Sequence, residues 1–318
     1  MYNEELKTKF IQDYTKSVAT ANTCRVIFDV VGKFEESWGA DLCTKSAAEL
    51  QPVIDSITGL RAQSKWMRLI VLKEYVKWCI NVAKVPNACD GMLQIDSIGL
   101  DKVRQQTVSS PLHLQQYLNS ICEPESEKTT DNIYRCFYWL AYGGVAEEDI
   151  LNIKCSDVDF DNMVVYYKGT EVPIYREALL AFKNCVNLTQ FVYKHPNYEK
   201  LIYKDRADGD TVVRGIKNVC SLKSMRVELS RRSREKMDDG KTELKLSYFR
   251  VWISGLFYRA YERERAGMPV DFSGAAAQFM EGKTYKLDSG RNTPEAKRRK
   301  LTRDYLEDYE RWKLAFSI

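Results

Sequence analysis

The sequence has few histidines and no closely spaced cysteines. His113 and His195 are the only histidines among 318 residues, and no two of the nine cysteines form a C-x-x-C pair. Structural zinc sites usually combine closely spaced cysteine and histidine ligands, so we expect no metal ion, and no cofactor is indicated. An odd cysteine count, with several cysteines on apolar faces of predicted helices, favours reduced core residues over a disulfide framework.

Long apolar segments are also missing. No run approaches the roughly 18 apolar residues of a membrane span, and the N-terminal stretch MYNEELKTKF is charged, without the apolar core of a signal peptide. We therefore expect no membrane partner and a cytoplasmic protein.

The length and composition indicate a folded chain with two domains. With 318 residues, 44% of them hydrophobic, the chain is long for one compact core and has ample apolar surface to bury. The formal charge of +4 is only mildly basic. Such a small excess says little about partners, so the distribution of charge along the chain matters more than its total.

Helical patterns fill the first third of the chain. Apolar residues recur at helical spacing over 23–39, Ser46 and Glu49 have the spacing of a capping box, and a longer apolar helix is expected over 62–85. Ser110 followed by Pro111 is a helix-start signal. We place the domain boundary between about Gly99 and Ser110, which predicts domains at residues 1–105 and 106–318.

The second part mixes helices with a short hairpin. Helices are expected at roughly 111–122 and 130–142, and the run NMVVYYKGTEVPI reads as a β-hairpin that turns at Lys168, Gly169 and Thr170. Three or more helices complete the chain. The predicted fold class is mainly α with a small antiparallel β-sheet.

Basic residues gather in separated clusters. A helix face in the first domain and the run KSMRVELSRRSREK in the second carry most of them, and AKRRK at 296–300 adds a third group. Any one cluster is typical of a solvated helix face, but clusters in two domains favour a clamp that neutralises the phosphates of double-stranded DNA. The DNA-binding residues that we predict are Arg61, Lys65, Arg68, Lys73, Lys77, Lys223, Arg226, Arg231, Arg232, Arg234 and Arg250.

The order of these motifs resembles the tyrosine recombinase (phage integrase) family. The run ILNIKCSDVDF is similar to that family's leucine-lysine-tryptophan-aspartate segment, and the lysine in the hairpin turn and the N-terminal helices fit the same order. The resemblance implies an N-terminal helical core-binding (SAM-like) domain followed by an α+β domain of the tyrosine-recombinase catalytic type. It also implies DNA cleavage through a phosphotyrosyl bond, without a metal.

Carried over position by position, the family's catalytic set is incomplete. Its first arginine should fall at Ala146, and no Arg or Lys lies between Tyr142 and Ile153. The hairpin lysine matches Lys168. The motif SYFR matches the family's histidine-x-leucine-arginine motif, with Ser247 in the histidine position and Arg250 in the second arginine position.

The nucleophile has two interpretations. Tyr305, after the basic AKRRK segment, is the candidate for delivery from a C-terminal helix. Alternatively, the spacings of four, three and four between Tyr305, Tyr309, Trp312 and Phe316 form an apolar stripe that packs in the chain or on a second subunit. The stripe is the favoured interpretation, and it makes this helix a candidate for homo-oligomerisation.

Loss of an oriented cation from a site that stabilises developing negative charge costs orders of magnitude in rate. The sequence therefore favours a phage- or prophage-type DNA-binding protein, a sequence-specific repressor or architectural factor whose recombination chemistry is lost or weakened, and not an enzyme. The alternative is an active divergent integrase built from Lys168, Arg250, Tyr305 and another arginine such as Arg226 or Arg259. A third interpretation is a helical interaction protein without any nucleic-acid role.

Overall fold

The computed structural model describes residues 1–15, 17–57, 62–95, 100–122, 130–194, 200–215, 221–240, 242–281 and 293–318. Two compact units divide the chain: Met1–Val103 together with Asp304–Ile318, and Arg104–Arg303. The predicted division placed the whole C-terminal helix in the second domain, whereas its last part groups with the first unit.

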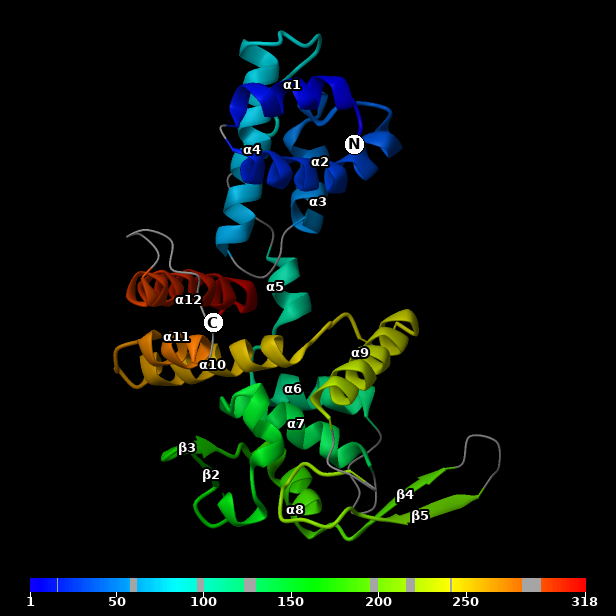
Figure 1. The fold of residues 1–318 in the computed structure, drawn as a ribbon, viewed down its shortest axis with the longest axis vertical. Helices are drawn as coiled ribbons and strands as arrows, with labels where there is room; N and C mark the ends of the chain where they lie inside the picture. The colour runs from blue at the N-terminus through cyan, green and yellow to red at the C-terminus, as the bar shows by residue number, and fades with distance from the viewer. Residues whose placement is uncertain are drawn as a thin grey trace. The chain divides into compact units, whose positions relative to one another are not determined.

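The first unit is helical. It contains α1 (Glu4–Tyr14), α2 (Val18–Trp38), the 3-10 turn η1 (Leu42–Thr44), α3 (Ala47–Ile57) and α4 (Ala62–Asn81), and α5 (Asp101–Gln106) crosses the division between the units (Figure 1). The capping box at the start of α3 is present, since Ser46 N donates to Glu49 Oε2 at 2.9 Å. α2 begins earlier than predicted because the hydroxyl of Ser17 accepts a hydrogen bond from Thr20 N and caps it.

An ion pair lies inside the core of this first unit. The side chains of Lys7 and Glu35 are both fully buried and contact each other between α1 and α2. Lys7 also donates to the carbonyl oxygen of Tyr2 at 2.8 Å, and Glu35 accepts from Leu42 N at 3.0 Å. Burial raises the pKa of Glu35 and the Lys7 charge opposes that rise. The pair ties α1, α2 and the η1 turn together.

The second unit is built around one buried helix. Its helices are α6 (Pro111–Ile121), α7 (Asp131–Gly143), α8 (Leu179–Asn187), α9 (Leu222–Asp238), α10 (Tyr248–Arg265), α11 (Ser273–Met280) and the start of α12 (Pro294–Phe316), with 3-10 turns η2 (Glu147–Asn152), η3 (Cys155–Asp157) and η4 (Arg176–Ala178). α7 packs against α8 and α10. A Cβ atom on Gly255 would lie 1.9 Å from the carbonyl oxygen of Tyr142, so only glycine allows α10 to approach α7 this closely.

Two antiparallel sheets accompany these helices. The first consists of β1 (Val158–Asp159), β2 (Val164–Tyr167) and β3 (Thr170–Pro173), with Tyr167 paired to Thr170. Lys168 and Gly169 form its turn with φ of 48° and 75°, as two-residue hairpin turns require. The predicted hairpin and the predicted fold class are confirmed.

The second sheet was not predicted. β4 (Gln190–Lys194) pairs with β5 (Leu201–Asp205), and both strands project from the helices of this unit (Figure 1). The sequence assigned only helices to the chain after the first hairpin, although the aromatic and β-branched runs QFVYK and LIYKD carry a strand signal. The eight described cysteines are free thiols, and six of them are buried, which confirms the expectation of reduced core residues for that part of the chain.

Candidate nucleic-acid interface

The segment that lacks the expected arginine is a tightly packed turn. Gly144 ends α7 with φ of 109°, and its N–H donates to the carbonyl oxygens of Leu140 and Ala141. Val145 is buried and its carbonyl oxygen accepts a hydrogen bond from Tyr248 Oη at 2.7 Å. Ala146 N donates to Tyr167 Oη at 3.4 Å. The turn is therefore held by tyrosine hydroxyls, and it contributes no cation of its own.

The acidic residue after this turn binds the hairpin lysine. Asp149 Oδ2 accepts a hydrogen bond from Tyr167 Oη at 2.6 Å and lies 3.0 Å from Lys168 Nζ. Burial opposes ionisation of Asp149, but the hydrogen bonds from Tyr167 and Lys168 lower its pKa. Glu281 Oε2, at the end of α11, lies 3.5 Å from the same Nζ atom. The hydrogen bond to Asp149 raises the pKa of Lys168, so the lysine remains a cation that is balanced by two carboxylates.

Arg250 lies elsewhere in the same unit and has a different kind of partner. It belongs to the first turn of α10, after Ser247 at the N-cap, and its guanidinium donates to Gln106 Oε1. Burial lowers its pKa to about 10. Among the described residues no carboxylate pairs with it. Arg250 is thus a partly desolvated cation, and its side-chain partner among the described residues is a neutral amide.

A cavity of about 570 Å³ lies beside Arg250. Its wall comes from the end of α5, α7, α9, the start of α10 and the segment before α10. It includes the basic residues Arg226, Arg234, Lys245 and Arg250, with Asp238 as the one carboxylate. Neither Lys168 nor Ala146 is among its lining residues. The structure therefore brings Arg226, Arg234 and Arg250 together around one cavity and leaves Lys168 with Asp149.

Tyr305 is part of an apolar stripe along α12. Its side chain is 1% exposed, and Tyr309 and Trp312 are buried with it. The rings of Tyr309 and Trp312 stack with centroids 6.0 Å apart. These residues belong to the unit that contains Met1–Val103, whereas Arg250 and Lys168 belong to the other unit. The burial matches the stripe interpretation of the sequence.

The structure describes only some of the basic side chains that were predicted to bind DNA in the first unit. Arg61 and the side chain of Lys65 lie outside the described residues. Arg68 is partly exposed on α4, Lys73 Nζ donates to the carbonyl oxygen of Leu93 at 3.3 Å, and Lys77 pairs with Glu74 at 2.7 Å. The face that was predicted as cationic thus includes residues with partners inside the protein.

The basic residues of α9 fall into two groups. Arg226 pairs with Glu147 at 2.5 Å and Arg232 pairs with Asp131 at 2.8 Å. Arg231 pairs with Glu228 at 2.7 Å and with Glu235 at 2.5 Å. Within the described part of the chain, Lys223 and Arg234 have no carboxylate within ion-pair distance. Sequence reasoning missed the pairing because Glu147 and Asp131 come from distant segments.

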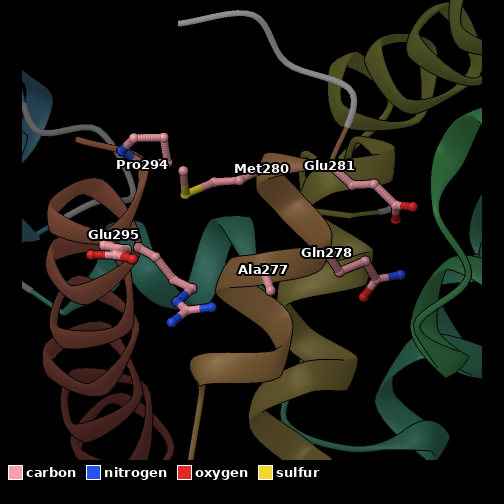
Figure 2. A pocket seen from close by; sticks show the side chains of 7 residues that line it. Ala277, Gln278, Met280, Glu281, Pro294 and Glu295 are labelled. Atoms are coloured by element: carbon pink, nitrogen blue, oxygen red, sulfur yellow. The ribbon is translucent and has the colours of Figure 1, made fainter. Parts of the chain in front are cut away.

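The third basic segment begins α12 and borders a second hollow. A cavity of about 640 Å³ is lined by residues of α11 and the first turns of α12, among them Met280, Pro294 and Arg298. Figure 2 shows the side chain of Met280 directed toward Pro294, while Gln278 and Glu281 point to the other side of α11. Glu281 is the residue that pairs with Lys168, so this hollow lies beside the lysine contact.

The described residues contain neither a metal-binding cluster nor a helix suited to cross a membrane. No group of three or more His, Cys, Asp or Glu side chains lies close enough to hold a metal ion in the described ranges. None of the helices, as far as they are described, combines the length and the apolar character that crossing a bilayer requires.

Comparison with known proteins supports the first domain most directly. Residues 1–81 match the family model described as "MrpR, N-terminal core-binding domain". No curated protein matches the chain. The family match confirms the predicted core-binding domain and supports the resemblance to the tyrosine recombinase family.

Three solved structures are similar in arrangement. The XerA recombinase shares 12% identity with a TM-score of 0.38, and the match covers 84% of this chain and 86% of that one. A lambda integrase dimer bound to a core site shares 11% identity with a TM-score of 0.33, covering 91% of this chain and all of that one. The Tn1549 transposon integrase, in complex with a circular intermediate DNA, shares 13% identity with a TM-score of 0.32, covering 94% and 98%.

Proposed function

We propose that this protein, whose N-terminal residues match a core-binding domain and whose motifs resemble those of tyrosine recombinases, binds a specific double-stranded DNA site without cleaving it. In this role it acts as a phage- or prophage-type repressor or architectural factor. Similar structures include integrases that are described as bound to DNA, and DNA is accordingly the partner that we assign to this chain.

The observation that carries the proposal is the pairing of Lys168 with Asp149. In a strand-transfer site of this type, the hairpin lysine protonates the leaving oxygen and arginines stabilise the phosphorane-like charge. Here Lys168 is balanced by Asp149 and Glu281, and Ala146 offers no guanidinium. Preorganised cations are the main source of stabilisation for such a transition state, so their absence from the turn makes cleavage very slow.

Among the predicted basic residues of α9, we assign DNA backbone contacts to the two that have no carboxylate partner in the described part of the chain. These are Lys223 and Arg234, and both side chains are exposed. The residues already held in ion pairs, such as Arg231 and Arg232, contribute less, because a carboxylate must be displaced before a phosphate can bind. Arg61, Lys65, Arg68, Lys73 and Lys77 provide the contacts that we propose for the first domain.

Binding and cleavage are separated by two measurements on the full chain. First, DNA fragments selected from a random pool are titrated by fluorescence anisotropy at several salt concentrations, and we expect affinity to fall linearly in a log-log plot. Second, a nicked suicide substrate that carries the selected site is incubated with the protein. We expect a complex that slows the DNA in a native gel, and no covalent protein–DNA adduct. An adduct that disappears in Tyr305→Phe would refute the proposal, and mobility of DNA that is unaffected at every salt concentration would favour the interaction-protein interpretation.

One observation favours the second candidate, an active divergent integrase. Arg226 comes from α9, yet its guanidinium contacts Glu147 with two hydrogen bonds of 2.5 Å. Glu147 follows Ala146 directly, so Arg226 brings a cation next to the position where the family's first arginine is missing. In this alternative, Arg226, Arg250, Lys168 and Tyr305 form a rearranged site, and Arg226→Gln abolishes the adduct on the suicide substrate.

Self-association through α12 is a further part of the proposal. Leu306 and Leu314 are the exposed apolar residues of that helix, and a second copy of the chain is the partner that we assign to them. Light scattering of the full chain at increasing concentration tests this, with Leu314→Glu as the variant that is expected to remain monomeric.

A further inference from the structure

The cavity beside Arg250 contains positive charge that the protein itself does not balance. Arg226 already pairs with Glu147. The other three basic residues of the wall, Arg234, Lys245 and Arg250, have no carboxylate partner in the described part of the chain. Asp238 is the only acidic residue among the lining residues. Three cations against one carboxylate leave an excess of two positive charges around one hollow.

The effect of this unbalanced charge is clearest in the pKa of Arg250. Burial is the only cause that shifts its pKa, and it lowers the value to about 10. Arg232 is buried to a similar degree, but there the ion pairs with Asp131 and Glu228 outweigh burial and raise the pKa. A guanidinium that is partly removed from water without an anion beside it is normally paired with a ligand or a charged residue.

Part of the lining of the same cavity is apolar. Phe137, Leu229 and Leu246 are almost fully buried and line it, together with Tyr138, whose hydroxyl donates to the carbonyl oxygen of Leu246 at 3.1 Å. A volume of about 570 Å³ lies within the ordinary range for small-molecule sites. The lining thus combines apolar side chains with cations, and Ser230 and Ser247 also belong to it.

We propose that this cavity is a binding site for a small phosphate monoester that carries an aromatic or apolar group, such as a nucleoside monophosphate. The phosphate bears nearly two negative charges at neutral pH and offers several acceptor oxygens, which matches the excess of two cations. Arg234 and Arg250 provide guanidinium groups of the kind that bind phosphate with paired hydrogen bonds. The ring lies against the apolar part of the lining. This site shares Arg234 with the proposed DNA contacts, but its lining residues all belong to one unit of the protein, and the test below is made without DNA.

The test uses the full chain without DNA and adenosine 5′-monophosphate as the probe. We expect saturable binding in calorimetry and a rise in melting temperature of at least about 3 °C at saturating probe. We expect two fragments of the probe to bind at least about tenfold more weakly. Adenosine lacks the phosphate and loses the contacts with the arginines, whereas inorganic phosphate lacks the ring and loses the apolar contacts.

Two neighbouring arginines provide matched variants. Arg234 lines the cavity, whereas Arg231 pairs with Glu228 and Glu235 and is not among the lining residues. Arg234→Gln and Arg231→Gln change the net charge equally and are made at exposed positions of the same helix. We expect Arg234→Gln, and more strongly its combination with Lys245→Gln, to weaken probe binding about tenfold or more, and Arg231→Gln to leave it unchanged.

Two results would overturn the proposal. An equal loss of probe affinity in Arg234→Gln and Arg231→Gln would mean that the probe responds to general charge. Stabilisation of the protein by adenosine, which carries no phosphate, would remove the role of the phosphate. DNA backbone phosphate is the other source of the same chemistry. If the probe does not bind, and Arg234→Gln with Lys245→Gln weakens only DNA binding, the cavity receives a DNA phosphate and the small-ligand proposal fails while the proposed function stands.

Discussion

Nζ of Lys168 lies 3.0 Å from Oδ2 of Asp149, and the two residues come from different segments: the turn of the β2–β3 hairpin and the 3-10 turn η2. Asp149 lies three residues after Ala146, the position at which the resemblance places the family's first arginine. Its carboxylate contacts the hairpin lysine and accepts a hydrogen bond from Tyr167, so this acidic group is already paired within the protein.

The first prediction concerns this pair. Asp149→Asn should lower the free energy of unfolding by about 1 kcal/mol, a value kept small because the site is partly exposed. The pKa of Asp149 is lowered in the folded state, so its stabilising effect is present above the unfolded pKa of about 4 and is lost as the pH falls through the folded value. Urea unfolding at pH 7 and near pH 3 measures the difference, which should shrink at the lower pH.

Glu148→Gln serves as the control for that measurement, because the neighbouring carboxylate makes no ion pair within the described residues. If Glu148→Gln and Asp149→Asn destabilise the protein equally, the loss reflects the acidity of the segment and not the contact with Lys168.

The second prediction concerns the buried Lys7–Glu35 pair. Lys7→Met removes one partner and leaves a carboxylate in an apolar interior, so we expect a loss of about 3–5 kcal/mol in the free energy of unfolding. Lys7→Met combined with Glu35→Gln should recover a large part of it, because an amide can still accept the hydrogen bond from Leu42 N. Urea denaturation of the single and double variants tests this. Losses that simply add would show that the two side chains are not coupled.

The third prediction separates DNA contacts from internal ion pairs on α9. Lys223→Gln should lower the slope of log affinity against log salt by about 1, because one phosphate contact is lost. Arg232→Gln should leave the slope nearly unchanged and instead lower the melting temperature, since Arg232 pairs with the buried Asp131. Anisotropy titrations and thermal melts of both variants are the measurements. A slope that changes equally for both would mean that the ion pair opens on DNA.

The fourth prediction concerns Tyr305. Because its ring is 1% exposed, Tyr305→Ala should destabilise the protein by about 3 kcal/mol or more, while Tyr305→Phe keeps the ring and should leave DNA affinity unchanged. Thermal unfolding and DNA titration are compared for the two variants. Tyr203→Ala removes an exposed tyrosine of β5; it is the control and should cost far less than Tyr305→Ala.

Local signals in the sequence were sufficient for several elements. Ser46 and Glu49, Ser110 and Pro111, and Lys168 with Gly169 each act through contacts within a few residues, and each begins or ends an element where the sequence predicted it. The β4–β5 hairpin was missed even though its strands carry aromatic and β-branched residues. Those strands are joined by polar and charged residues without a short glycine turn, so the pattern did not match that of a tight hairpin.

The candidate site was predictable in its residue types and not in its contacts. Arg250, Ser247 and Ala146 were identified from motif spacing alone. Lys245 and Gln106 were missed, because neither belongs to a motif and both reach the cavity only through packing around α10.

By itself the sequence determined the helical character of the chain, the hairpin with its lysine, the core-binding pattern at the N-terminus and the absence of a cation at Ala146. All of these depend on neighbouring residues or on residue identity. Only the tertiary structure decided which charges remain available. Arg226 meets Glu147 across 79 positions of the chain, and Lys168 meets Asp149 and Glu281, while Arg234 and Arg250 are left beside one cavity. Ion pairing requires a separation of a few ångströms, and the folded arrangement of distant segments sets that separation.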